Sequence, residues 1–424
     1  MIAAIRETPE LKGSVSAPPS KSYTHRVVMA ATLSKGRTRI ESPLFCEDTE
    51  MSLRACQTFG ARIVYGLRSI TVTGPEKLRA PAEPIDCLES GSTMRFLIPV
   101  AALARGRTVL TGSPGLLRRP VGPLIEAVQD LGAKCTSESG YPPVTIQGVL
   151  AGGKASIVGD VSSQFVTGLL LACPLARRDT EVTVTTPLES KPYVRLTLSI
   201  LKKHGIVIGA SAGLRRFQIP GRQSYSICDH VVPGDYSSAA FLMAAAALTG
   251  SSITIGNLAL EPEQPDSQIL SILKRMGAKV EVKGEEVTVK GASLRGVDVD
   301  ARDIPDLVAV VAALGCMASG TTRILGAERL RLKESDRLSS ITVELRKFGS
   351  KVKEEVDSLE VEAPHMLKAA EAESHNDHRI AMACAILGLV AKGETQIRGA
   401  ECVAKSYPRF FEDLRSLGGN ITVS

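Results

Sequence analysis

The sequence predicts an α/β protein of six modules, each about 70 residues long, arranged as two domains of three modules. Two periodic features carry this prediction. A glycine that ends a helix-like stretch recurs every 69 to 73 residues, and a polar segment that precedes an apolar helix-like stretch recurs every 69 to 74 residues. Solenoid repeats are shorter, at roughly 20 to 50 residues, so the period indicates a small folded α/β module.

The first periodic feature is a glycine at the end of a helix-like stretch. It occurs at Gly60, Gly132, Gly205, Gly277, Gly349 and Gly418. A glycine just beyond a helix adopts a left-handed conformation that other residues disfavour, and it turns the chain out of the helix. A strand-like stretch follows each of these glycines. We therefore expect six helix-to-strand turns at these positions.

The second periodic feature is an apolar helix followed by a polar turn and a strand. The six predicted helices are 27–33, 95–104, 165–176, 239–248, 307–318 and 379–390. The turns include Lys35-Gly36, Arg105-Gly106, Thr249-Gly250, Ser319-Gly320 and Lys392-Gly393. Together, the two features give each module the order strand, helix, strand, helix, strand, strand. The longest apolar run, 380–391, is too short to cross a bilayer and predicts a buried helix.

Two proline-containing segments predict where the chain passes between the domains. One is Ser16-Ala17-Pro18-Pro19, and the other is Val231-Val232-Pro233-Gly234. If the first strand belongs with the C-terminal half, one domain comprises residues 1–18 and 233–424. The inserted domain then comprises residues 19–232. Two connecting segments would form a natural hinge.

The composition excludes several classes of protein. The 424 residues are 44% hydrophobic and 23% charged, which rules out a disordered chain. The charged segment Met1–Lys12 does not fit a signal peptide, and nine cysteines without a CxxC pair indicate reduced thiols. We therefore expect a cytoplasmic protein without a metal site. The net charge of +6 is compatible with an anionic small molecule but only weakly supports nucleic-acid binding.

Polar segments lie just before the six apolar helices. They start at Lys21, Glu89, Asp160, Asp235, Asp303 and Asn376. Helix capping by Ser, Asp and Asn explains part of this pattern, most simply at Ser237-Ser238. It does not explain Lys21, Gln164 or His378-Arg379, because cations are unfavourable at a helix N-terminus. The alternative is an anion site, since helix N-termini present free N–H groups to a bound anion. Pseudo-symmetry would bring several such ends together in a cleft between the domains.

The chain resembles the 5-enolpyruvylshikimate-3-phosphate (EPSP) synthase family, or 3-phosphoshikimate 1-carboxyvinyltransferases. The most specific motifs are Lys333-Glu334-Ser335-Asp336-Arg337 and Asn376-Asp377-His378-Arg379. The other matching segments, in family order, are 19–26, 90–95, 119–120, 162–164, 190–193, 304–306 and 405–408. The resemblance implies two inside-out α/β barrel-like domains, each of three βαβαββ modules, with the active site in the cleft between them.

The resemblance also implies the substrates and the residues that hold them. Shikimate 3-phosphate would be bound by Ser22, Arg26, Ser162, Ser163, Gln164, Ser190, Tyr193, Asp306 and Lys333. Phosphoenolpyruvate would be bound by Lys21, Gly91, Arg119, Gln164, Arg337, His378, Arg379 and Lys405. Proton transfer would fall to Lys21, Asp306 and Glu334. No cofactor or metal is implied, because the cations themselves offset the phosphates and carboxylates of the two substrates.

Two positions depart from the family pattern. Many members have Asn in place of Glu89, and many have Asn in place of Arg329. The first leaves open the role of a carboxylate beside the phosphoenolpyruvate pocket, and the second leaves open one shikimate contact. Gly91 matches the small residue associated with glyphosate sensitivity in the family. We therefore expect glyphosate to inhibit in competition with phosphoenolpyruvate.

Three alternatives remain at the level of sequence. The sister transferase that acts on UDP-N-acetylglucosamine normally carries a reactive Cys or Asp in the loop before Arg119, and 113–118 contains neither. An RNA-phosphate cyclase of related fold would need a nucleotide-phosphate loop and a basic tract. A binding protein that has lost catalysis is opposed by the intact set Lys21, Asp306, Glu334, Arg337 and Lys405. The family resemblance implies a monomer that binds neither nucleic acid nor membrane.

Overall fold

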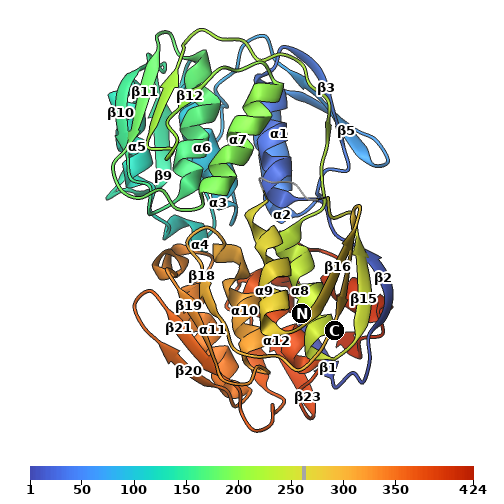
Figure 1. Ribbon diagram of the computed structural model, residues 1–424. Helices are drawn as coiled ribbons and strands as arrows, with labels where there is room; N and C mark the ends of the chain where they lie inside the picture. The colour runs from blue at the N-terminus through green and yellow to red at the C-terminus, as the bar shows by residue number, and fades with distance from the viewer. Residues whose placement is uncertain (260–263) are drawn as a thin grey trace. The chain divides into compact units, whose positions relative to one another are not determined.

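The computed structural model describes residues 1–259 and 264–424, which form two compact units (Figure 1). One unit comprises Met1–Pro19 and Pro233–Ser424, and the other comprises Ser20–Val232. The described residues form six four-stranded sheets, three in each unit. No helix within these residues is long and apolar enough to span a membrane.

All six sheets have the same topology. An edge strand runs parallel to its neighbour, and the next two pairs are antiparallel. One example is the sheet formed by β6 (Ile85–Asp86), β7 (Arg107–Thr111), β9 (Tyr141–Gln147) and β8 (Lys134–Glu138). In this module the chain runs through β6, α3 (Gly91–Ala101), β7, α5 (Gly122–Asp130), β8 and β9, with the short α4 (Pro114–Leu117) before α5. The order is strand, helix, strand, helix, strand, strand, so the predicted α/β module is confirmed.

The Ser20–Val232 unit contains three of these sheets. They are β14 (His230–Val231), β3 (Gly36–Glu41), β5 (Ser69–Gly74) and β4 (Arg62–Tyr65); β6 (Ile85–Asp86), β7 (Arg107–Thr111), β9 (Tyr141–Gln147) and β8 (Lys134–Glu138); and β10 (Gly153–Ile157), β11 (Thr180–Val184), β13 (Arg216–Ile219) and β12 (Gly209–Ala210). Its helices are α1 (Lys21–Leu33), α2 (Glu47–Thr58), α3 (Gly91–Ala101), α4 (Pro114–Leu117), α5 (Gly122–Asp130), α6 (Ser163–Ala172) and α7 (Lys191–Lys203).

The unit formed by Met1–Pro19 and Pro233–Ser424 contains the other three sheets. They are β22 (Glu371–Glu373), β23 (Glu394–Arg398), β1 (Ile2–Arg6) and β24 (Ile421–Val423); β16 (Lys279–Lys283), β17 (Glu286–Lys290), β15 (Ser252–Gly256) and β2 (Lys12–Ser16); and β18 (Asp298–Asp300), β19 (Thr321–Leu325), β21 (Leu359–Glu362) and β20 (Lys351–Glu354). Its helices are α8 (Tyr236–Leu248), α9 (Ile269–Met276), α10 (Val308–Gly315), α11 (Arg337–Lys347), α12 (His378–Gly388) and α13 (Phe410–Ser416).

Strands remote in sequence complete several sheets. β1 lies between β23 and β24, and thereby joins the two ends of the chain in one sheet. β2 is the parallel edge strand beside β15, and β14 is the parallel edge strand beside β3. Each of these two edge strands immediately precedes a passage of the chain from one unit to the other. Thus β2 precedes α1 in sequence but belongs to a sheet of the other unit, and β14 precedes α8 in sequence but belongs to the sheet that contains β3.

Helices occupy the interior of each unit. Every side chain of α8, α10 and α12 is buried. These three helices contact one another inside their unit, where their ribbons lie side by side (Figure 1). Their sequences are apolar on all sides, as expected for helices without a solvent face. In the other unit α1, α3 and α6 are buried except at their first two residues, where Lys21, Ser22, Ser92 and Gln164 are partly accessible. The partly accessible side chains of these three helices thus lie at the helix N-termini.

The predicted glycine turns are confirmed. The six glycines of the first periodic feature have φ between +75° and +110°. A side chain would be strained in this left-handed conformation, so glycine at these positions ends each helix before the next strand.

The helix N-termini are capped, though not always by the expected residue. The side chains of Ser20, Ser90, Ser162 and Asp377 each accept a hydrogen bond from a backbone N–H of the helix that follows. The cap predicted at Ser237-Ser238 is wrong in detail, because Asp235 caps α8 by accepting from the Ser238 N–H. The Ser237 hydroxyl instead donates to Asp266. Helices α1, α3, α6 and α12 also begin earlier than predicted, because the polar caps and not the apolar runs set their starts.

A chain of hydrogen bonds fixes β14 against α1 and α7. His204 Nδ1 lies 2.8 Å from the carbonyl oxygen of Ser226 and therefore carries its proton, since a carbonyl only accepts. His204 Nε2 then accepts from His230 Nε2 at 2.9 Å, and His230 Nδ1 accepts from the Tyr23 hydroxyl at 3.3 Å. Lys203 Nζ donates to that hydroxyl at 3.4 Å. One of the two Nε2 atoms must therefore be unprotonated, so the two imidazoles cannot both carry a positive charge.

Low pH should weaken the hydrogen bond between His204 and His230, because both imidazoles gain protons as the pH falls. Burial lowers the pKa of both His204 and His230, and His204 and Lys203 lower that of His230 further, against the effect of Asp229, to about 4. Between pH 4 and the ordinary value near 6.5, the unfolded chain binds more protons, so the free energy of unfolding falls as the pH falls. Wild type should therefore lose stability between pH 7 and pH 4. In His230→Gln we expect this loss in the free energy of unfolding to be smaller by on the order of 2 kcal/mol.

Urea unfolding at pH 7 and pH 4, followed by far-UV circular dichroism, measures this difference. His365 is exposed, so His365→Gln is the matched control and should keep the wild-type dependence. An equal loss of stability in wild type and His230→Gln would contradict the role of the pair.

Candidate active site

The predicted residues fall into two groups, one in each unit. The group in the Ser20–Val232 unit begins with Lys21, the first residue of α1. Its Nζ lies 2.8 Å from Oδ2 of Asp48 in α2, and the two side chains are only 17% and 11% exposed. A lysine at a helix N-terminus is unfavourable by itself, because the positive end of the helix dipole repels it. The carboxylate of Asp48 offsets this repulsion.

Arg26 lies one turn further along α1 and is buried. Its guanidinium donates to the Ser22 carbonyl at 2.8 Å, the Tyr193 carbonyl at 3.2 Å and the Thr197 hydroxyl at 2.9 Å. It also stacks over the rings of Phe96 and Tyr193. Burial lowers the pKa of Arg26 to about 10. These acceptors are neutral, so a bound anion would stabilise the buried charge.

Gly91 opens α3 beside two further arginines. A Cβ at this position would lie 3.2 Å from Nη1 of Arg119 and 3.3 Å from Nη1 of Arg95. Arg119 is buried, and its Nη2 lies 3.4 Å from Oε2 of Glu89. The carboxylate that departs from the family pattern is thus the ion-pair partner of Arg119. A side chain at this position would therefore press against both guanidinium groups, whereas glycine leaves them their room.

Gln164 links α6 to α3. Its Oε1 accepts from Arg95 at 2.7 Å, and its Nε2 donates to the Ser92 hydroxyl at 2.7 Å. Ser162 caps α6, and Ser163 is buried as its first residue. On α7, Ser190 stands at the N-cap in a left-handed conformation with φ of 51°. Apart from Arg26, which lies further along α1, the predicted shikimate residues of this unit therefore lie at helix N-termini or in the first turn.

The group in the other unit centres on Arg337, the first residue of α11, whose side chain is only 1% exposed. Its guanidinium contacts three carboxylates: Asp377 at 2.8 Å, Glu334 at 2.6 Å and Asp306 at 3.1 Å. Burial alone would lower the pKa of Arg337, but these three anions outweigh burial and raise it. The arginine therefore fixes the positions of both carboxylates predicted to transfer protons.

Asp306 lies in a 3₁₀ turn, Pro305–Leu307, and bridges two arginines. Arg379 Nη2 is 3.0 Å from its Oδ2, and Arg337 Nη1 is 3.1 Å from its Oδ1. Burial raises the pKa of Asp306, but Arg379, Lys333 and Arg337 together hold it well below its usual range. Burial lowers the pKa of Lys333 to about 8, against the effect of Asp306. Asp306 is thus a carboxylate surrounded by cations.

His378 and Lys405 complete this group. His378 is buried in the first turn of α12, with Nδ1 4.0 Å from Oδ1 of Asp377. Lys405 ends a 3₁₀ helix, Ala400–Lys405, and its Nζ donates to the Asn376 carbonyl at 2.8 Å. Both side chains are almost fully buried. Each predicted residue of this unit is therefore held close to the Asn376–Arg379 segment or to Arg337.

Sequence reasoning missed four participants. Arg95 follows Gly91 by one helical turn, a spacing that places both on one face and could have identified it. Asp377 lies inside the motif Asn376–Arg379, but its contact with Arg337 joins segments that are distant in sequence. Nothing in the sequence indicates Asp48 as the partner of Lys21. Asp266 is buried near Asp306, and burial together with Asp306 raises its pKa to about 7 against the effect of Arg379.

Arg329, the second departure from the family pattern, borders the group around Arg337. It is buried, donates to the Arg302 carbonyl at 2.7 Å and, after burial itself, helps to lower the pKa of Lys333.

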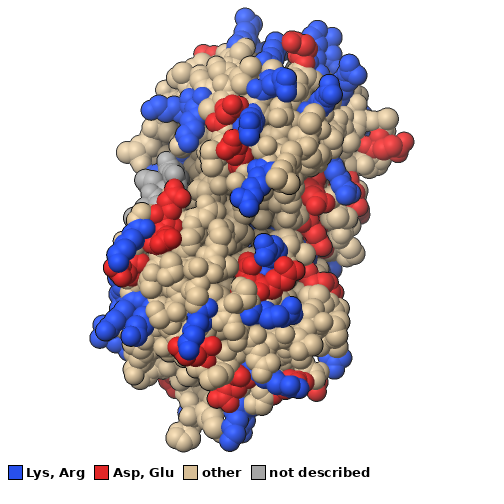
Figure 2. Space-filling view, turned by 90° about the vertical axis from the view of Figure 1, so that its right-hand side faces the viewer, with Lys and Arg blue, Asp and Glu red and all other residues tan. Residues whose placement is uncertain are grey.

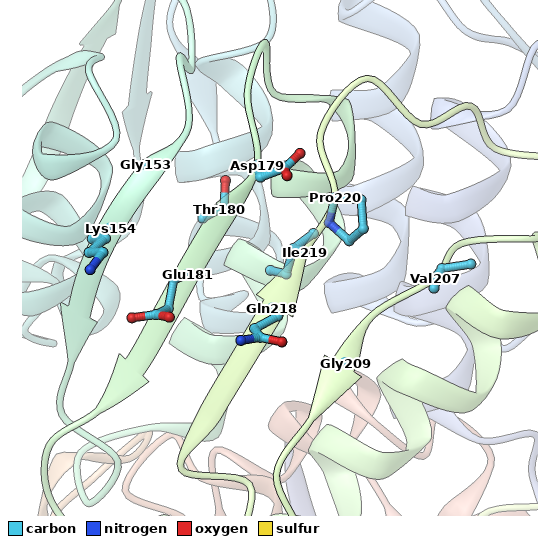
Figure 3. A pocket seen from close by; sticks show the side chains of 10 residues that line it. All are labelled: Gly153, Lys154, Asp179, Thr180, Glu181, Val207, Gly209, Gln218, Ile219 and Pro220. Atoms are coloured by element: carbon cyan, nitrogen blue, oxygen red, sulfur yellow. The ribbon is translucent and has the colours of Figure 1, made fainter.

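Other features lie outside these groups. A hollow of about 580 Å³ lies along β10, β11, β12 and β13, and none of the predicted residues lines it (Figure 3). Lys and Arg are interspersed with Asp and Glu on the face drawn in Figure 2. Among the described residues, no group of three or more His, Cys, Asp or Glu is arranged to hold a metal ion.

Comparison with known proteins identifies the family. Residues 5–414 match the model of EPSP synthase (3-phosphoshikimate 1-carboxyvinyltransferase). The chain is 45% identical over 428 residues to the 3-phosphoshikimate 1-carboxyvinyltransferase of Methanocella arvoryzae, with 100% of both chains covered. It is 43% identical over 426 residues to that of Methanocaldococcus jannaschii, with 99% of both covered.

A solved structure agrees with the sequence relatives. The EPSP synthase of Acinetobacter baumannii superposes with a TM-score of 0.83 at 28% identity, covering 100% of this chain and 99% of that one. The likeness in fold and the match in sequence extend over nearly the same residues. The chain therefore belongs to the EPSP synthase family.

Proposed function

We propose that this chain transfers the enolpyruvyl group of phosphoenolpyruvate to the 5-hydroxyl of shikimate 3-phosphate and releases phosphate. The observation that supports this most directly is a set of buried or largely buried cations: Lys21, Arg26, Arg119, Arg337, Arg379 and Lys405. The two substrates carry two phosphates and two carboxylates. Arginine donates two parallel hydrogen bonds to either group, so this set suits their recognition.

Both units contribute residues to the proposed binding of each substrate. In the Ser20–Val232 unit, Ser22, Arg26, Ser162, Ser163, Gln164, Ser190 and Tyr193 would hold shikimate 3-phosphate, and Lys21, Gly91, Arg119 and Gln164 would hold phosphoenolpyruvate. In the other unit, Asp306 and Lys333 would bind the hydroxyls, and Arg337, His378, Arg379 and Lys405 would bind phosphoenolpyruvate. Each unit supplies part of the set, so neither unit alone should turn over the substrates.

The reaction would proceed by addition and elimination. The 5-hydroxyl oxygen bonds to C2 of phosphoenolpyruvate while C3 gains a proton, which gives a tetrahedral intermediate. The bond from C2 to the phosphate oxygen then breaks, C3 loses a proton and inorganic phosphate leaves. We assign Asp306 as the base for the hydroxyl, and Glu334 and Lys21 to the protons at C3.

The environment of Asp306 suits a base. Its three cations keep it ionised, which is the form that accepts a proton. Anionic substrates placed among Arg379, Lys333 and Arg337 would partly neutralise these cations. The pKa of Asp306 would then rise and make the carboxylate a stronger base once the substrates are bound.

Release of inorganic phosphate from phosphoenolpyruvate tests the proposal. The purified chain is assayed with shikimate 3-phosphate and, separately, with UDP-N-acetylglucosamine. We expect release only with shikimate 3-phosphate. Release only with the sugar nucleotide would assign the sister reaction, and absence of release from folded protein would favour a binding protein. A monomeric state and a cytoplasmic location belong to the same proposal and are checked by size-exclusion chromatography and cell fractionation.

Glyphosate should inhibit in competition with phosphoenolpyruvate, because Gly91 places no side chain against Arg119 and Arg95, the cations that a small anion would contact. In Gly91→Ala the added methyl would lie within 3.3 Å of both guanidinium groups and should raise the inhibition constant at least tenfold. Steady-state kinetics at several phosphoenolpyruvate concentrations measure this. Gly213 has open space around its Cα, so Gly213→Ala is the control. Inhibition independent of phosphoenolpyruvate concentration would contradict the prediction.

A further inference from the structure

The carboxylate of Glu89 already pairs with Arg119, the arginine that the proposed function assigns to phosphoenolpyruvate. Glu89 Oε2 lies 3.4 Å from Arg119 Nη2, and the Glu89 carbonyl oxygen accepts from Nη1 at 3.4 Å. The two side chains are 12% and 6% exposed. Both contacts are long for charge-assisted hydrogen bonds, which are typically about 2.7 to 2.9 Å. The pair is therefore shielded from water but loosely held.

The backbone makes room for this carboxylate. A Cβ at Gly115, in α4, would lie 2.5 Å from Oε2 and 2.7 Å from Oε1 of Glu89. Any side chain at 115 would push the carboxylate from its position beside Arg119. The close approach of α4 thus defines the position of the Glu89 carboxylate, which is not a freely rotating surface side chain.

Arg119 retains capacity for another anion. Its Nε is buried and has no hydrogen-bond partner among the described residues. Arg95 Nη1 lies close to the same point, because one Cβ at Gly91 would contact both guanidinium groups. A phosphate or carboxylate arriving here meets two cations, but also the charge of Glu89 at short range. Like charges in a poorly hydrated site repel strongly.

We propose that Glu89 is a specificity-determining residue: a resident carboxylate that neutralises Arg119 until an incoming anion displaces it. This inference rests on the proposed function for the identity of the anion. A ligand that engages several cations at once, such as phosphoenolpyruvate, can displace Glu89. A single small monoanion, such as chloride, gains too little from Arg119 alone. Glu89 therefore weakens the binding of every anion that must displace it, and only an anion with further cationic contacts still binds well.

Glu89→Gln tests the proposal, since it removes the charge while keeping the size of the side chain. We expect the KM for phosphoenolpyruvate to fall roughly three- to tenfold, with a smaller change in kcat. Chloride should become a competitive inhibitor of the variant at concentrations that leave wild type unaffected. Glu126→Gln, an exposed change on α5 of the same unit, is the matched control.

Two results would overturn the inference. A raised KM in Glu89→Gln would mean that Glu89 orients Arg119 for its ligand, and an unchanged KM would mean that it does not compete. Calorimetric titration of the full chain with inorganic phosphate gives a second measure, in which Glu89→Gln should bind more tightly than wild type. Because this needs no turnover, it tests Glu89 even if wild type fails to release phosphate and the proposed function is wrong.

Discussion

Asp306→Asn is expected to lower kcat by roughly 10²- to 10⁴-fold while the affinity for shikimate 3-phosphate changes only a few-fold. Asparagine keeps the shape of the side chain and its carbonyl oxygen, so contacts with substrate hydroxyls can persist. It cannot take up a proton, so the proposed base is lost. Steady-state kinetics and calorimetric binding of shikimate 3-phosphate separate these two effects.

Helix capping is not a sufficient explanation of Asp306. The side chain bridges Arg337 and Arg379, and the residues at the N-caps of the 3₁₀ turn and of α10 are Ile304 and Leu307. Asp300, which is exposed and pairs with Arg302, gives the matched control Asp300→Asn. That variant should retain wild-type kcat. Full activity in Asp306→Asn would remove Asp306 from catalysis, and loss of shikimate 3-phosphate binding would make it a binding residue.

The repeat was predictable because its determinants are local. A left-handed glycine such as Gly277 ends a helix whatever surrounds it, and an apolar helix such as α8 must be buried on every side. Helix starts were less predictable, because a cap such as Asp235 competes with nearby Ser237 for the same role. The pairing of β14 with β3 depends on residues almost 200 positions apart, and no local signal encodes it.

The cations of the site were also predictable, since Lys21 and Arg379 at helix N-termini need an explanation other than capping. Their carboxylate partners were not. Asp48 reaches Lys21 from the next helix, and Asp377 reaches Arg337 from a separate module. Such partners are chosen by tertiary packing. These carboxylates offset cationic charges that the substrates would also offset when bound.

Arg337→Met is expected to lower the free energy of unfolding by about 3 to 5 kcal/mol. The arginine side chain is 1% exposed and Asp377 is fully buried, so methionine would leave a buried carboxylate without its cation. Lysine keeps the charge but cannot form the guanidinium fork, so Arg337→Lys should lie between wild type and Arg337→Met. The chain has no Trp, so urea unfolding is followed by far-UV circular dichroism.

Two further variants identify the cause of this loss. Arg323 contacts Asp298 and Glu360 on the surface of the same unit, so Arg323→Met should cost less than about 1 kcal/mol. Adding Asp377→Asn to Arg337→Met removes the most buried of the three carboxylate charges that lose Arg337, while asparagine still caps α12. The double variant should therefore be more stable than Arg337→Met alone. If it is less stable, the loss comes from packing around the arginine and not from an uncompensated carboxylate.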